Sequence, residues 1–137
     1  MILMHVENEA RELAVRHAAA SIGERVFAIG PGELELKLSE IISRFAGPEE
    51  MRPELLKMLP FQLTPPGNEA VPVMYQMPEV LIFTSMEEDD IRTFLSAFRA
   101  GGEKPVALKA VVTPFNIGWT LFVLLGELGR ERDALRG

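Results

Sequence analysis

The sequence predicts a three-layer α/β fold that forms one domain of 137 residues. Short apolar runs alternate with amphipathic stretches of helical length, which is the pattern of a sheet covered by helices. The same order of elements occurs in both halves of the chain. The composition, with 47% hydrophobic and 25% charged residues, is that of a globular domain. A chain of this length buries enough surface to fold without disulfides.

The first half, about residues 1–45, predicts a strand, a helix, a strand and a helix in that order. Ile2–Val6 is an apolar run typical of a buried strand, and Asn8 can cap the helix that follows it. Gly23 is typical of the end of that helix. Arg25–Ile29 predicts the second strand, and apolar residues at helical spacing predict a second helix over Leu34–Phe45. The leucines at the start of this last range also alternate, so a strand is the competing interpretation there.

The second half, about residues 79–137, predicts the same order again. Val80–Phe83 is a strand, and Ser85 with Glu88 forms a capping box for the next helix. Val106–Val112 is the following strand, and the last helix runs from Thr120 to about Leu135. The two halves therefore read as two βαβα repeats.

The repeats predict how the strands are arranged. The junction from helix to strand is similar in both halves, Gly23–Val26 in the first and Gly102–Val106 in the second. Strands that alternate with helices favour a parallel sheet with right-handed crossovers. We therefore expect a four-stranded, mainly parallel sheet in the order 2-1-3-4.

A proline-rich connector, residues 46–78, separates the repeats and holds seven of the ten prolines. Pro53–Leu59 predicts one short helix, because proline is tolerated in the first turn. Val71–Met77 predicts an edge strand, because Pro72 cannot donate a hydrogen bond within a central one.

A candidate site follows from this strand order, since ligands bind open α/β sheets at the carboxyl ends of strands where the order reverses. The order 2-1-3-4 places that point between the first and third strands, which end at His5–Asn8 and Phe83–Glu87. The candidate ligand-binding residues are His5, Asn8, Ser85, Lys109, Thr113 and Asn116.

No catalytic residue and no metal site is predicted. The acidic run Glu87–Asp90 fits the first turn of a helix, where acids complement the helix dipole. His17 shares a helix face with Leu13, Ala14 and Ala18, and we expect it to be a packed structural residue. The sequence has no nucleophile elbow, no phosphate-binding glycine loop and no calcium loop.

Lys109 is the polar exception in the apolar strand Val106–Val112. An unpaired ammonium between two covering layers is costly to desolvate. The side chain therefore either reaches water from a strand at the sheet edge, pairs with a carboxylate, or binds an anionic ligand beside Thr113 and Asn116. The predicted strand order places it at an edge, which favours the first two arrangements.

Charge and composition limit the setting and the partners. The net charge is −6 and the basic residues are scattered, which argues against nucleic acid and anionic membranes. There is no cysteine, which fits a reducing compartment, and the longest apolar stretch, Trp119–Gly126, is far too short to span a bilayer. We expect a cytoplasmic protein with no cofactor, whose partner is a small molecule or a protein, and leave a homodimer open.

Two classes of function remain. The first is a non-catalytic module that binds a small ligand or has a regulatory or protein-interaction role. The alternative is a small enzyme with its site at the carboxyl ends of the first and third strands. The absence of a catalytic constellation favours the first.

The second half also resembles a known family. The residues that carry the resemblance are Val80–Phe83, Leu108–Pro114, Asn116, Trp119, Leu124, Leu125, Glu127, Leu128, Glu131 and Arg132. Over roughly residues 79–133 the chain resembles the prokaryotic family called domain of unknown function 3783. Phe115 stands where a small polar residue is expected. The resemblance implies an α/β fold and a cytoplasmic setting, and it implies no activity.

Overall fold

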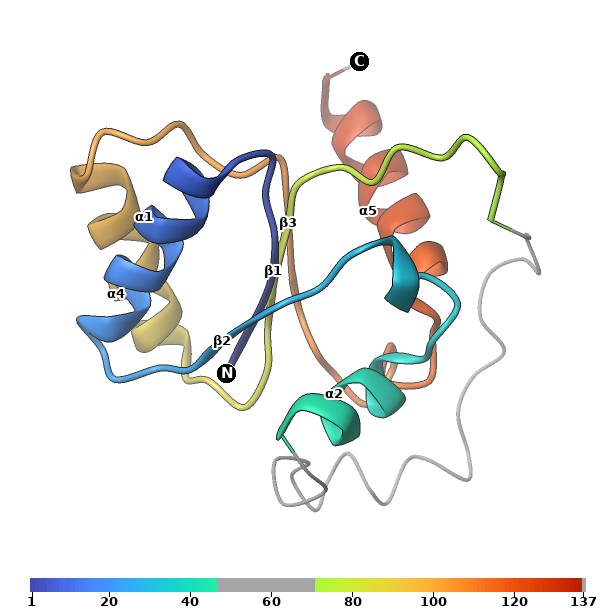
Figure 1. Ribbon diagram of the computed structural model, residues 1–137, viewed down its shortest axis with the longest axis horizontal. Coiled ribbons are helices and arrows are strands. Elements are labelled where there is room, and N and C mark those ends of the chain that lie inside the picture. Colours follow the sequence, from blue (N-terminus) through green and yellow to red (C-terminus); the bar gives the residue numbers. More distant parts are fainter. Residues whose placement is uncertain (47–70, 137) are drawn as a thin grey trace. The chain divides into compact units, whose positions relative to one another are not determined.

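The computed structural model describes residues 1–46 and 71–136, which form two compact units (Figure 1). The first unit consists of Met1–Ile29 and Pro78–Val111, and the second of Gly30–Met77 and Val112–Gly137. Each unit therefore draws on both halves of the sequence, so the units do not coincide with the two predicted repeats. One domain for all 137 residues stays a prediction.

The first unit contains a four-stranded sheet in the order β2-β1-β3-β4. Its strands are β1 (Ile2–His5), β2 (Val26–Ala28), β3 (Val80–Phe83) and β4 (Leu108–Val111). The predicted α/β class and the predicted strand order are both confirmed. The strands β2 and β4 lie at the two edges.

The sheet is mixed. β1 pairs with β2 in parallel and β3 pairs with β4 in parallel, as a strand–helix–strand crossover requires. The central pair β1–β3 is antiparallel, with Ile2 opposite Phe83 and His5 opposite Val80. The sheet is thus mainly parallel, as predicted, but the carboxyl ends of β1 and β3 lie at opposite ends of it. The prediction that these two ends form one site is therefore wrong.

Two helices of the first unit pack against each other beside the sheet (Figure 1). The helix α1 (Glu9–Ala20) begins after Asn8, whose side chain accepts a hydrogen bond from the Arg11 amide, as predicted. The helix α4 (Glu88–Ala100) begins after Glu87, and no side-chain cap bond forms there. The predicted capping box is wrong, because Ser85 lies two residues before the cap with a left-handed φ of 56°.

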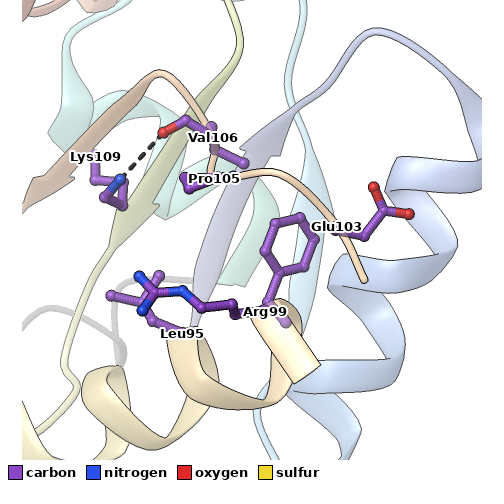
Figure 2. Close-up of a pocket in the computed structure, with 7 residues that line it drawn as sticks. Leu95, Arg99, Glu103, Pro105, Val106 and Lys109 are labelled. Atoms are coloured by element: carbon purple, nitrogen blue, oxygen red, sulfur yellow. Dashed lines mark hydrogen bonds between the residues drawn. The ribbon is translucent and has the colours of Figure 1, made fainter. Parts of the chain in front are cut away.

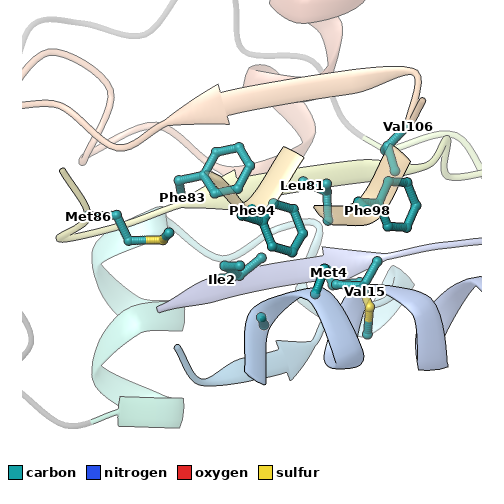
Figure 3. Packing of buried hydrophobic residues seen from close by; sticks show 11 residues of the cluster. Ile2, Met4, Val15, Leu81, Phe83, Met86, Phe94, Phe98 and Val106 are labelled. Carbon is teal, nitrogen blue, oxygen red and sulfur yellow. The ribbon is translucent and has the colours of Figure 1, made fainter. Parts of the chain in front are cut away.

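The core of this unit lies between the sheet and the two helices (Figure 3). Alternate residues of the two central strands point into it, since side chains along a strand alternate between faces. Phe94 of α4 is fully buried at the centre of this core. Its ring lies edge-on to Phe83, with 5.7 Å between ring centroids, and stacks on Phe98 at 6.2 Å. The labelled members in Figure 3 are Ile2, Met4, Val15, Leu81, Phe83, Met86, Phe94, Phe98 and Val106.

The buried face of α1 is not the one expected from sequence. Val15 and Ala18 are buried in the core, whereas Leu13 is 67% exposed and His17 is also exposed. Arg11 is buried on the same face, so the helix is rotated from the expected orientation. His17 is therefore not a packed residue.

The second unit holds the 3₁₀ turn η1 (Pro31–Glu33), the helix α2 (Leu38–Ala46) and the helix α5 (Leu121–Arg136). The helix predicted from Leu34 begins only at Leu38. An isolated antiparallel bridge joins Lys37 to Thr120 just before the two helices. On either side of it, the Leu38 amide donates to the Trp119 carbonyl and the Leu121 amide to the Leu36 carbonyl, both at 2.9 Å.

The structure describes residue 46 and residues 71–78 of the connector. The helix predicted over Pro53–Leu59 lies outside the described residues. Val71–Met77 is not an edge strand, because the Tyr75 amide donates to the Pro72 carbonyl at 3.1 Å and closes a turn. Tyr75 instead packs edge-on against Phe122 of α5, with 5.0 Å between ring centroids.

None of the helices in residues 1–46 and 71–136 combines the length and the apolar composition that a membrane span requires.

Gly102 gives a test of the turn that leads from α4 towards β4. Its φ is +88°, and an added Cβ meets nothing within 4 Å, so the cost of a side chain there is purely conformational. We expect Gly102→Ala to lower the free energy of unfolding by about 1 kcal/mol in urea denaturation. Gly32→Ala is the matched control, since Gly32 has open space and no positive φ. Equal effects of the two changes would show that Gly102 does not adopt a positive φ.

Candidate functional site

The most buried charged side chain of the first unit belongs to Arg11, a residue that is 3% exposed. Its Nε and Nη2 donate to the two carboxylate oxygens of Glu79 at 2.7 and 2.8 Å, a bidentate pair. Its Nη1 donates to Glu103 Oε2 at 3.0 Å and to the Lys104 carbonyl at 3.1 Å. The group also lies 5.6 Å from the centroid of the Phe98 ring. Arg11 therefore ties α1 to the start of β3 and to the connection that follows α4.

The charges of this cluster stabilise one another. The hydrogen bond to Glu79 raises the pKa of Arg11, against the opposing effect of burial. Burial alone would raise the pKa of Glu79, but hydrogen bonds from Arg11 and the Glu7 amide, with the charges of Arg11 and Lys104, lower it below its ordinary value. Both groups are therefore ionised at neutral pH, and Arg11 is fully engaged in structure.

A pocket lies beside this cluster, between α4 and β4 (Figure 2). We call it the α4–β4 pocket, and its lining residues are Leu95, Phe98, Arg99, Glu103, Pro105, Val106 and Lys109. Its volume is about 40 Å³. That volume admits a few heavy atoms, whereas pockets that enclose a metabolite measure roughly 300–1,000 Å³.

The walls of the α4–β4 pocket are apolar and its rim is basic. Leu95, Pro105 and Val106 supply aliphatic surface. The exposed side chains of Arg99 and Lys109 line it from the helix and from the strand, and the Lys109 ammonium donates to the Val106 carbonyl at 3.1 Å (Figure 2). The pocket can therefore receive a small apolar group joined to an acidic one.

The structure separates the residues predicted to form a site at the first and third strands. His5 lies at the carboxyl end of β1, with Nδ1 3.0 Å from the Ile29 carbonyl oxygen, and Asn8 caps α1. Ser85 follows the carboxyl end of β3, which lies at the other end of the sheet. His5 and Asn8 therefore follow one end of the sheet, and Ser85 follows the opposite end.

Lys109 occupies the edge strand β4 and is exposed, as its predicted edge position requires. Thr113 and Asn116 belong to the second unit and bond to each other. The Thr113 amide donates to Asn116 Oδ1 at 2.8 Å, and the Asn116 amide donates to Thr113 Oγ1 at 3.3 Å. This reciprocal pair closes the turn before α5. A ligand-binding role for the six predicted residues stays a prediction.

Metal ligands are not gathered anywhere in the described part of the chain: residues 1–46 and 71–136 contain no group of three histidine or acidic side chains placed to hold an ion.

The predicted resemblance is confirmed over the second half. Residues 79–135 match the family model described as Domain of unknown function (DUF3783). No curated protein and no solved structure matches the chain. The matched segment contains every residue that lines the α4–β4 pocket, together with Glu79 and Glu103 of the ion cluster. Arg11 lies outside it.

Sequence reasoning missed Arg11 and the residues of the DUF3783 segment that surround it. One signal was available, because Arg11, Val15 and Ala18 share a helix face at the spacing of a buried stripe. A basic residue in phase with such a stripe predicts a buried ion pair. No comparable signal marks Arg99, which is one of several exposed charged residues on α4.

Proposed function

We propose that the chain is a non-catalytic binding module whose α4–β4 pocket recognises an acidic group attached to a small apolar one. The observation that carries this proposal is the combination of aliphatic walls with Arg99 and Lys109 at the rim. A binding site of this kind needs few polar groups, which fix the orientation of a ligand that is otherwise held by apolar contact.

The chemistry of the lining residues supports binding rather than catalysis. Leu95, Pro105 and Val106 are unreactive. Glu103 is the acid of the pocket, and its carboxylate accepts a hydrogen bond from the buried Arg11. A general base must be within reach of a substrate proton. Glu103 is engaged by Arg11, so it is not placed as a general base.

The wider setting is part of the same proposal. A cytoplasmic location is supported by the absence of cysteine, which fits a reducing compartment. A prokaryotic origin is proposed on the family resemblance of the second half alone. Duplication of one βαβα unit is supported by the parallel strand pair within each half and by the reciprocal bonds beside the Lys37–Thr120 bridge. The acidic net charge continues to disfavour nucleic acid as a partner.

The proposal is tested with 3-methylbutanoate, a branched carboxylate small enough for the pocket. We expect its titration into ¹⁵N-labelled protein to shift amide resonances of residues 95–109, with a dissociation constant on the order of millimolar for so few atoms. The neutral isostere 3-methylbutanamide is the matched control and should bind more weakly. Shifts confined to other residues, or equal binding of the amide, would contradict the proposal.

A further inference from the structure

We infer that the occupant of the α4–β4 pocket is a segment of a partner protein in which one aliphatic side chain stands next to carboxylates. This inference rests on the proposed function, and it names the class of partner that the pocket binds. It depends on the size of the pocket, on the distribution of charge around it and on the rigidity of its walls.

The size of the pocket fits one side chain. A volume of about 40 Å³ accepts the branched end of a leucine, isoleucine or valine and little more. A free ligand of that size gains at most about 1.5 kcal/mol per heavy atom and in practice much less. A peptide segment inserts the same group and adds contacts along the exposed surface around it, which a small molecule cannot do.

The charges around the pocket select an acidic segment. Two nearby basic residues already have partners. Arg92 on α4 is paired with Glu88 and Asp89, and Lys104 is paired with Glu7. Arg99 is exposed and, within residues 1–46 and 71–136, makes no ion pair.

The carboxylate that lines the pocket does not cancel this basic rim. Arg11 pairs with both Glu79 and Glu103, so one negative charge of this cluster remains. The two basic residues of the lining outnumber this single acid. Arg99 and Lys109 therefore form a basic rim on a chain of net charge −6. Such a rim attracts carboxylates and repels basic segments.

The walls of the pocket are held in place by the core. Phe98 and Val106 are 3% and 2% exposed and belong to the buried cluster of the first unit. Phe98 is further fixed by its stacking on Phe94 and by the Arg11 guanidinium. A preformed recess costs little conformational entropy when a partner binds.

The inference is tested by incubating the full-length protein with an array of nine-residue peptides. Each peptide has either leucine or serine at its centre, flanked on each side by four residues that are aspartate, asparagine or lysine. Binding of the best peptides is then measured in solution by fluorescence anisotropy. The protein variants are Arg99→Gln and Arg92→Gln, which change the same residue type on the same helix, and thermal unfolding confirms that both are folded.

We expect binding only when leucine and aspartates occur together. Arg99→Gln should weaken it at least about tenfold, as loss of an arginine contact to a carboxylate does when that arginine is a binding hot spot. Arg92→Gln should change it by less than about twofold, as an exposed ion pair predicts. Equal binding of the lysine or serine peptides, or no effect of Arg99→Gln, would overturn the inference.

The remaining outcomes separate the inference from the proposed function. If 3-methylbutanoate shifts residues 95–109 while no peptide binds, the peptide partner is wrong and the binding module stands. If neither ligand binds, both are wrong. If sedimentation shows a dimer that Arg99→Gln dissociates in the absence of peptide, the occupant is a second copy of the chain and the inference falls.

Discussion

Replacing Glu79 by glutamine is expected to lower the free energy of unfolding at pH 7 by about 3 kcal/mol, because it leaves the buried Arg11 guanidinium without its main counter-charge. Arg11 and Glu79 side chains are 4% and 14% exposed, and two hydrogen bonds join them. Glu103 and the Lys104 carbonyl still contact Arg11 in the variant, so the loss is that of one charge and not of the whole cluster.

The effect of Glu79→Gln depends on pH in a defined direction. The pKa of Glu79 is lowered in the folded protein, so its contribution to stability is present above the ordinary pKa of about 4.3 and is lost as pH falls through the folded value. The wild type and Glu79→Gln should therefore converge in stability at acid pH. Urea denaturation across pH 3–7 measures this convergence.

Glu12→Gln is the matched control for Glu79→Gln. Glu12 pairs with Arg16 on the exposed side of α1, the helix that carries Arg11, and the two side chains are 37% and 43% exposed. Such a pair contributes about 0.5 kcal/mol. A cost for Glu79→Gln as small as that of Glu12→Gln, or a cost that does not change with pH, would show that the Arg11 cluster is not a buried charge network.

Phe94→Ala is expected to have the largest effect of any single change in the core, about 3–5 kcal/mol. Phe94 is 0% exposed and contacts both Phe83 and Phe98, so its removal leaves a cavity that the strands and α4 can fill only in part. The measurement is the free energy of unfolding in urea, followed by far-UV circular dichroism.

Leu13→Ala is the control for this cavity, because Leu13 lies on α1 and is 67% exposed. Its truncation should change stability by less than about 0.5 kcal/mol. The sequence periodicity predicts Leu13 on the inner face of α1. Equal costs for Phe94→Ala and Leu13→Ala would support that predicted orientation and contradict the structure.

The strand order could be predicted from sequence, whereas the direction of the central pair could not. Apolar runs such as Val80–Phe83 mark strands, and the helix within each half fixes the parallel pairs β1–β2 and β3–β4. The connection from β2 to β3 spans residues 29–79, and a connection that long permits either direction. The predicted site failed at this step, because its geometry required parallel central strands.

The side chains at helix starts show a second limit of sequence reasoning. Asn8 caps α1 as its type predicts, but Ser85, equally suited to cap α4, adopts a left-handed φ two residues earlier. Arg11 shows a third limit, since its partners Glu79 and Glu103 are 68 and 92 residues away in sequence. Such pairing is set by the tertiary fold, which local patterns do not encode.

The pocket as a binding site is tested most directly by nuclear Overhauser contacts in a complex with 3-methylbutanoate. The ligand methyl protons should show contacts to the methyl groups of Leu95 and Val106, which line the pocket. These contacts should disappear in Arg99→Gln at the same ligand concentration. Contacts to the exposed methyl groups of Leu13 or Val73 instead, or contacts that survive Arg99→Gln unchanged, would contradict a pocket that combines aliphatic walls with a basic rim.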